Sequence, residues 1–212
     1  MIRVIIGAVP AALAMFVIGF IFFASGLQNI ATRSLDDLPA AAVQRSLATN
    51  LQGTGTYIVP NPATSAAQTT MYGRGPIATI HYNAGGFPAM DTGALLGGLV
   101  LDFIVALLIG AALIGIDRRV PDFPSRARVV AILAVAASAF MHLGEPIYYH
   151  HDWLHFIYLF IADAAALIAA GLIIARWFLP KGVSAVYEPR EANAHPHASV
   201  AEAEVRGTGE GI

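Results

Sequence analysis

Residues 93–116 read GALLGGLVLDFIVALLIGAALIGI, and this stretch decides the class of fold. It holds a single charged side chain, Asp102. A helix needs about 20 mainly apolar residues to cross the hydrocarbon core of a bilayer. We therefore predict that this stretch is a transmembrane helix.

The rest of the chain fits the same interpretation. Of its 212 residues, 57% are hydrophobic and only 12% are charged, and the mean hydropathy is +0.64. Soluble domains carry about 25% charged residues. Three further apolar runs cover residues 4–26, 128–143 and 153–179. The predicted fold is an all-α membrane protein, a bundle of four transmembrane helices with a small extracytoplasmic α+β segment between the first two.

Composition also excludes several classes of function. A formal net charge of −2 offers no basic face for nucleic acid. The absence of cysteine excludes disulfides, thiolate nucleophiles and cysteine-ligated metal sites. No nucleophile elbow, phosphate loop or dinucleotide fingerprint occurs, so we favour a role that is not enzymatic.

Basic residues predict the orientation in the membrane. The connection over residues 117–128 contains Arg118, Arg119, Arg126 and Arg128, whereas the opposite connection, 144–152, contains no lysine or arginine. Short loops rich in arginine stay in the cytoplasm. We expect a multi-pass protein of the bacterial inner membrane with both termini cytoplasmic. The first apolar run is longer than a signal-peptide core of about 7–15 residues, which favours an uncleaved anchor.

These boundaries divide the chain into four parts. We expect a transmembrane helix within residues 1–26, an extracytoplasmic segment over 27–92, three transmembrane helices within 93–180 and a disordered cytoplasmic tail over 181–212. In the extracytoplasmic segment, apolar residues at near-helical spacing predict an amphipathic helix over 37–51. The runs TYIVP and PIATIHYN favour two strands, paired as a hairpin.

Two carboxylates fall where the bilayer is driest. Asp102 and Asp163 each lie about 14–15 Å below the outer surface, at a rise of 1.5 Å per residue. The basic residues of the predicted spans, Arg128 and Arg176, lie at span ends far from both acids, so we expect the two acids to meet and share a proton. A functional interpretation is a proton path, a cation path or a ligand anchor. The structural interpretation, which we favour here, is a protonated carboxyl that hydrogen bonds between helices.

A second polar cluster lies in MHLGEPIYYHHDWLH, residues 141–155. His151 and His155 are four residues apart, a spacing that places two imidazoles on one helical face to hold a metal. His81 could add a ligand from the extracytoplasmic segment. A divalent transition metal, such as zinc, copper or iron, is the cofactor this chemistry suits. The alternative, which we favour, is a belt of amphipathic side chains at headgroup depth. The candidate ligands within the cluster are His142, Glu145, His150, His151 and His155.

Small residues mark candidate helix contacts. Gly93 and Gly97 form a GxxxG pair, and Ala162, Ala166 and Ala170 recur every four residues. Small side chains allow membrane helices to approach closely. The pattern predicts either a tight bundle or docking against another membrane subunit.

The opening apolar run, GTYIVP at 55–60, GPIATIHY at 75–82 with Gly85, and the aspartate of the second span together resemble a family of uncharacterised bacterial inner-membrane proteins. Its members have one span, a long extracytoplasmic segment and then three spans. The resemblance covers residues 1–180 and implies this layout, but it supplies no activity, substrate or cofactor. The histidine-rich turn is not part of that pattern.

Three functions follow as hypotheses. The first is an accessory or structural subunit of a larger membrane complex, such as a respiratory or photosynthetic one, with lipid and other membrane subunits as partners. The second is a metal-binding protein or metalloenzyme that uses the histidine cluster. The third is a small proton-coupled transporter that uses Asp102 and Asp163.

Overall fold

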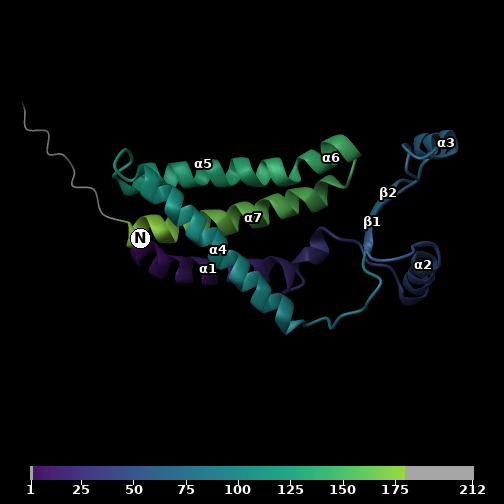
Figure 1. The fold of residues 1–212 in the computed structure, drawn as a ribbon, viewed down its shortest axis with the longest axis horizontal. Helices are drawn as coiled ribbons and strands as arrows, with labels where there is room; N and C mark the ends of the chain where they lie inside the picture. Colours follow the sequence, from purple (N-terminus) through teal and green to yellow (C-terminus); the bar gives the residue numbers. More distant parts are fainter. Residues whose placement is uncertain (1, 180–212) are drawn as a thin grey trace, which may run out of the picture.

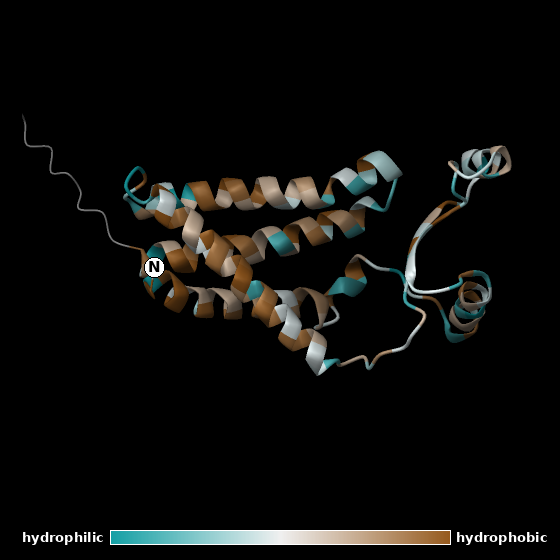
Figure 2. Ribbon diagram, in the orientation of Figure 1, coloured by the Kyte–Doolittle hydropathy of each residue, from teal (hydrophilic) through white to brown (hydrophobic). Residues whose placement is uncertain are grey.

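Helices dominate the computed structural model, which describes residues 2–179 and is 71% helical. The four long helices are α1 (Ile2–Phe23), α4 (Thr92–Ile116), α5 (Phe123–His142) and α7 (Trp153–Ile173) (Figure 1). Each belongs to one of four segments long and apolar enough to cross a membrane. Figure 2 shows that apolar residues cover these four helices, whereas the smaller elements at one end are more polar.

The four helices form a bundle only in part. Helix α1 packs against α4 and α7, and α7 packs against α5. Helix α4 crosses the others obliquely and its first half diverges from them (Figure 1). Leu96 and Val100 in that half are 61% and 59% exposed. The predicted bundle of four helices is therefore confirmed in part: three helices lie side by side, and the fourth crosses them.

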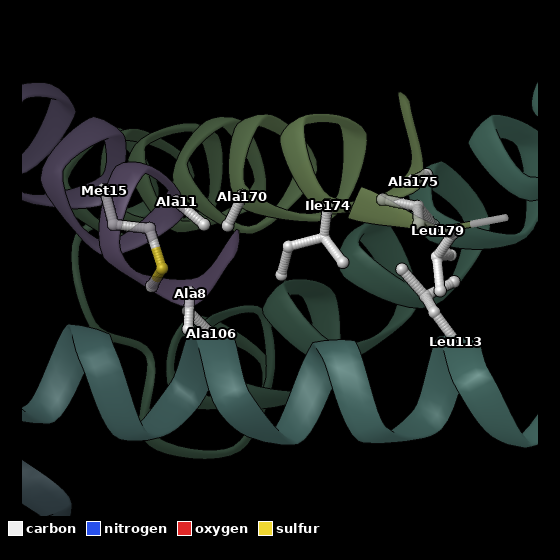
Figure 3. Close-up of a cluster of buried hydrophobic side chains, with 10 residues drawn as sticks. Ala8, Ala11, Met15, Ala106, Leu113, Ala170, Ile174, Ala175 and Leu179 are labelled. Carbon is white, nitrogen blue, oxygen red and sulfur yellow. The ribbon is translucent and has the colours of Figure 1, made fainter. Parts of the chain in front are cut away.

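Small side chains build the core where the helices meet. The buried cluster joins α1, α4, α5, α7 and the π-helical turn η2 (Ile174–Phe178), and Figure 3 shows most of it. Alanines in it allow close backbone approach. Its members are Ala8, Ala11, Met15, Ala106, Leu113, Val130, Ala170, Ile174, Ala175 and Leu179.

Glycines mark the closest helix contacts. A Cβ built on Gly110 would lie 2.4 Å from Cγ1 of Val4, and one on Gly7 would lie 2.6 Å from Cγ of Phe178. By contrast, a Cβ on Gly97 would meet nothing within 4 Å, and one on Gly93 would meet only Asp91 Oδ1, at 3.1 Å. The GxxxG pair thus makes no helix contact within residues 2–179.

The three alanines that were also predicted to make helix contacts do face the interior of the helices. Ala162 and Ala170 are buried, at 2% and 0% exposure, and Ala166 packs against the core cluster.

The segment between α1 and α4 has its own small fold. It contains η1 (Leu27–Ile30), α2 (Asp37–Asn50), β1 (Gly55–Val59), α3 (Ala66–Arg74) and β2 (Ala78–Tyr82). The strands pair antiparallel, with Thr56 opposite His81. The predicted helix and strand pair are confirmed. Helix α3 was not predicted, because its sequence is polar and lacks a hydrophobic period; Ser65 caps it by accepting from the backbone N–H of Gln68.

Two helix boundaries differ from the sequence prediction. Helix α5 begins at Phe123 instead of residue 128, because Asp122 caps it by accepting from the Ser125 backbone N–H at 2.9 Å. Residues expected in the turn after α5 instead form the short helix α6 (Gly144–Tyr149). The predicted tail, 181–212, lies outside the described residues.

Candidate functional site

The main polar contact between the long helices joins α5 to α7. His142, the last residue of α5, places Nε2 2.6 Å from Oδ2 of Asp163, near the middle of α7. The two side chains are 15% and 36% exposed. An ionised carboxylate only accepts hydrogen bonds, so the imidazole N–H donates here. Bonds of this kind with a charged partner are short and strong.

This partner for Asp163 was missed in the sequence. We expected Asp163 to have no cationic partner and to share a proton with Asp102, but its hydrogen bond goes to His142. A signal for the pair was present: His142 and Asp163 are nearly equidistant in sequence from Asp152, where the chain enters α7. Two antiparallel helices joined by a short turn bring such positions opposite each other.

Asp102 and Asp163 nevertheless reach the same cavity, as their matched depths predict. This cavity has a volume of about 670 Å³ and lies among α1, α4, α7 and the end of α5. No hydrogen bond or ion pair to the Asp102 side chain is found among residues 2–179. We call Asp102, Asp163 and His142 the acid–histidine site.

Aromatic and sulfur-containing side chains form much of the remaining wall. Phe16, Phe20 and Phe23 of α1 recur at helical spacing on one face, and Met15 and Met141 also line the cavity. Of the described residues that line the cavity, Asp102 and Asp163 are the charged ones. The cavity is thus an apolar chamber with two acidic groups.

Ser138 lies one turn before His142 on α5. Its side chain is fully buried, and its hydroxyl finds no hydrogen-bond partner among the residues described. A buried hydroxyl without a partner costs about 1–3 kcal/mol.

The remaining candidate ligands gather at a second, more open cavity of about 980 Å³, here called the histidine cleft. His81 of β2 lines it, as predicted, together with residues after α5. Nδ1 of His81 lies 3.2 Å from Oγ1 of Thr56, its cross-strand neighbour. The other candidate ligands in its wall are Glu145, His150, His151 and His155.

Geometry in the cleft does not assemble a metal site. Helix α7 begins only at Trp153, after its cap Asp152, so His151 precedes the helix and the expected shared face with His155 is wrong. The His151 ring is instead stacked on Tyr149 and Phe156, at centroid distances of 5.7 and 5.6 Å. Over the described residues, no group of three or more histidine or acidic side chains is placed to hold one metal ion.

Three of the candidate histidines have local structural roles that direct them away from a shared metal site. Nδ1 of His151 lies 3.2 Å from Oε2 of Glu145, which ties the turn to α6. His142 is directed to Asp163 and does not line the cleft. His150 has a backbone φ of 55°, a left-handed conformation that ends α6. Each of these three residues thus has a local structural role.

The chain matches no protein-family model, and comparisons with curated proteins and with solved structures find no match. The family resemblance of the sequence therefore stays a prediction. Function has to be inferred from the geometry of the acid–histidine site.

Proposed function

We propose that this protein is a small proton-coupled transporter of the bacterial inner membrane, in which the acid–histidine site binds the coupling proton. All four long helices cross the lipid, and both termini lie in the cytoplasm. The apolar cover of these helices supports insertion (Figure 2). The arginines at the α4–α5 connection support the orientation.

The observation that carries the proposal is the contact between His142 and Asp163. A charged side chain in the middle of a bilayer costs about 2.5 kcal/mol or more by insertion scales. One protonated carboxyl would be enough to hydrogen bond two helices. Here two carboxylates line one cavity, and an imidazole is hydrogen-bonded to one of them. Such a concentration of ionisable groups is typical of proton relays.

Histidine is the side chain whose charge ordinarily changes near neutral pH. One proton added to a neutral imidazole and a carboxylate gives either an imidazolium beside the carboxylate or a neutral imidazole beside a protonated carboxyl. Either change alters the charge that faces the cavity. Proton binding would thus be linked to what the cavity holds, which is the elementary step of coupling.

Infrared difference spectroscopy on the full chain in liposomes tests this step. As the pH is lowered, we expect the carbonyl stretching band of a protonated carboxylic acid to grow, because a carboxylate of the site takes up the coupling proton. Asp163→Asn should remove a component of the band, and His142→Gln should shift the pH at which it appears. The matched control is Asp36→Asn, an exposed acid whose side chain caps nothing. If Asp163→Asn gives the same band as wild type at every pH, the proposal fails.

An accessory subunit of a larger membrane complex is the second candidate. It is favoured by the first half of α4, where Gly97 is open and Leu96 and Val100 are exposed. A partner helix could pack there closely, because Gly97 presents no side chain. Gly97→Leu should then remove co-purifying membrane subunits in mild detergent, with Gly115→Leu, also open, as the control. Unchanged or absent co-purification would contradict this role.

A further inference from the structure

The acidic cavity has the features of a binding site for a particular class of molecule. Its volume, about 670 Å³, falls within the range that holds drug-sized ligands, which is roughly 300–1,000 Å³. Phe20 and Phe23 in its wall are 46% and 40% exposed, so the chamber opens at the surface of the helices. In a membrane that surface faces lipid, and a ligand would enter from the bilayer.

Charge is what selects among lipid-soluble ligands. The described residues that line the cavity carry two carboxylates and no lysine or arginine. His142 donates to Asp163, whereas Asp102 has no such partner among residues 2–179. An acid in apolar surroundings is stabilised either by a proton or by a cation beside it. Since the Asp102 side chain has no such partner among these residues, the cavity favours a proton or a positively charged ligand at this position and disfavours an anion.

The aromatic wall favours the same ligand class. Phe16, Phe20 and Phe23 follow one face of α1 beside the carboxylates. The negative face of an aromatic ring attracts a cation, most strongly where water is excluded. Aromatic rings together with a carboxylate suit a bulky organic cation, whose apolar body and dispersed charge both find complementary contacts.

We infer that this cavity binds a hydrophobic organic cation, such as a lipophilic quaternary ammonium or phosphonium ion, and that Asp102 exchanges its proton for the cation. This inference depends on the proposed proton-coupled function, because it names the substrate class of the same site. No covalent step is involved: the proton leaves Asp102 for the solvent, and the cation takes its place beside the carboxylate.

Tetraphenylphosphonium and tetraphenylborate are suitable probes, because they have the same shape and opposite charge. With the full chain in liposomes, we expect saturable binding of the phosphonium ion above lipid partitioning, weaker as the pH falls, and no saturable binding of the borate. Binding in a weakly buffered solution should release about one proton per cation.

Variants locate the interaction. Asp102→Asn should weaken phosphonium binding about tenfold or more and abolish proton release. Phe20→Leu should weaken it about three- to tenfold while proton release persists at saturation. Asp102→Glu should restore both, which separates lost charge from lost folding. Asp36→Asn should bind as wild type does.

The two proposals fail in different ways. Equal binding of both probes, or full binding by a folded Asp102→Asn, overturns the cation inference even if the infrared titration of Asp163 is observed. Saturable phosphonium binding without proton release and without pH dependence overturns the coupling and leaves the cation site in place.

Discussion

Gly171 of α7 and Val130 of α5 lie so close that a Cβ built on Gly171 would be 2.4 Å from Cγ1 of Val130. Real side chains do not approach to that distance, so the two helices meet there without any atom between them. This contact and the pair of His142 with Asp163 belong to the same antiparallel hairpin. The glycine at one end therefore supports the register that brings the histidine to the acid at the other.

Adding a methyl group at Gly171 should separate the helices. We expect Gly171→Ala to lower the free energy of unfolding by about 1–3 kcal/mol, because Val130 must shift in a packed core. Gly97→Ala is the control; it adds the same methyl where nothing lies within 4 Å and should be neutral or stabilising by up to about 1 kcal/mol. Unfolding in mixed micelles measures both.

A second-site change makes this prediction specific. Val130→Ala in the Gly171→Ala background removes the atoms that the new methyl would meet and should recover part of the loss. Equal stability of Gly171→Ala and Gly97→Ala would contradict the close contact.

Tyr158 ties α7 to the end of α1. Its hydroxyl donates to the carbonyl oxygen of Phe22, and its ring packs at 5.4 Å from the Phe22 ring. We expect Tyr158→Phe to lower the free energy of unfolding by about 1 kcal/mol, because a carbonyl of the last helical turn loses its donor. Tyr148→Phe, at a residue that is 78% exposed, serves as the control and should change it little. Identical losses in the two variants would refute a specific role for the hydroxyl.

Asp122 makes stability depend on pH at the start of α5. The hydrogen bond from the Ser125 backbone N–H is the main cause that lowers the pKa of Asp122 below its ordinary value. A lowered pKa in the folded state means that the unfolded chain binds the proton more readily, so the stabilisation is present above the unfolded pKa and is lost as the pH falls through the folded one.

Asp122→Asn keeps an oxygen that can accept the bond but cannot titrate. The stability difference between wild type and Asp122→Asn should therefore shrink as the pH is lowered through the acid range, in thermal unfolding followed by circular dichroism. Parallel curves for the two proteins would show that the carboxylate has no folded-state partner.

Variants at His151 distinguish a packing role from a metal-binding role for this residue of the histidine cleft. Because its ring is stacked on Tyr149 and Phe156, His151→Phe should keep the melting temperature near that of wild type, whereas His151→Ala should lower it. We expect added zinc to leave both wild type and variant unchanged. A zinc-dependent rise in melting temperature that His151→Phe removes would instead support the metal-binding alternative.

The absence of cysteine permits a direct test of membrane orientation. Pro121→Cys lies in the arginine-rich connection, and Ala40→Cys lies on α2; both positions are exposed. In intact spheroplasts, a membrane-impermeant thiol reagent should label Ala40→Cys. It should label Pro121→Cys only after lysis. Labelling of position 121 from outside would reverse the proposed topology.

Local sequence patterns predicted much of the fold. Long apolar runs identified the four helices, because their composition alone excludes a water-facing surface. The helix over 37–51 and the two strands were also recoverable, since their residue types favour those structures. Helix α3 and the early start of α5 were missed, because both depend on capping side chains, Ser65 and Asp122, rather than on an apolar period.

The sequence alone determined that Asp102 and Asp163 lie within long apolar runs, and counting residues along each run predicted that they lie at one depth. Only the tertiary structure decided that His142 pairs with Asp163, that Asp102 faces a shared cavity, and that Gly110 and Gly171, rather than Gly93 and Gly97, are the close contacts. These facts depend on the rotation and crossing of helices that are apolar on nearly every face. With no polar side to orient them, the contact faces are set by how side chains fit together.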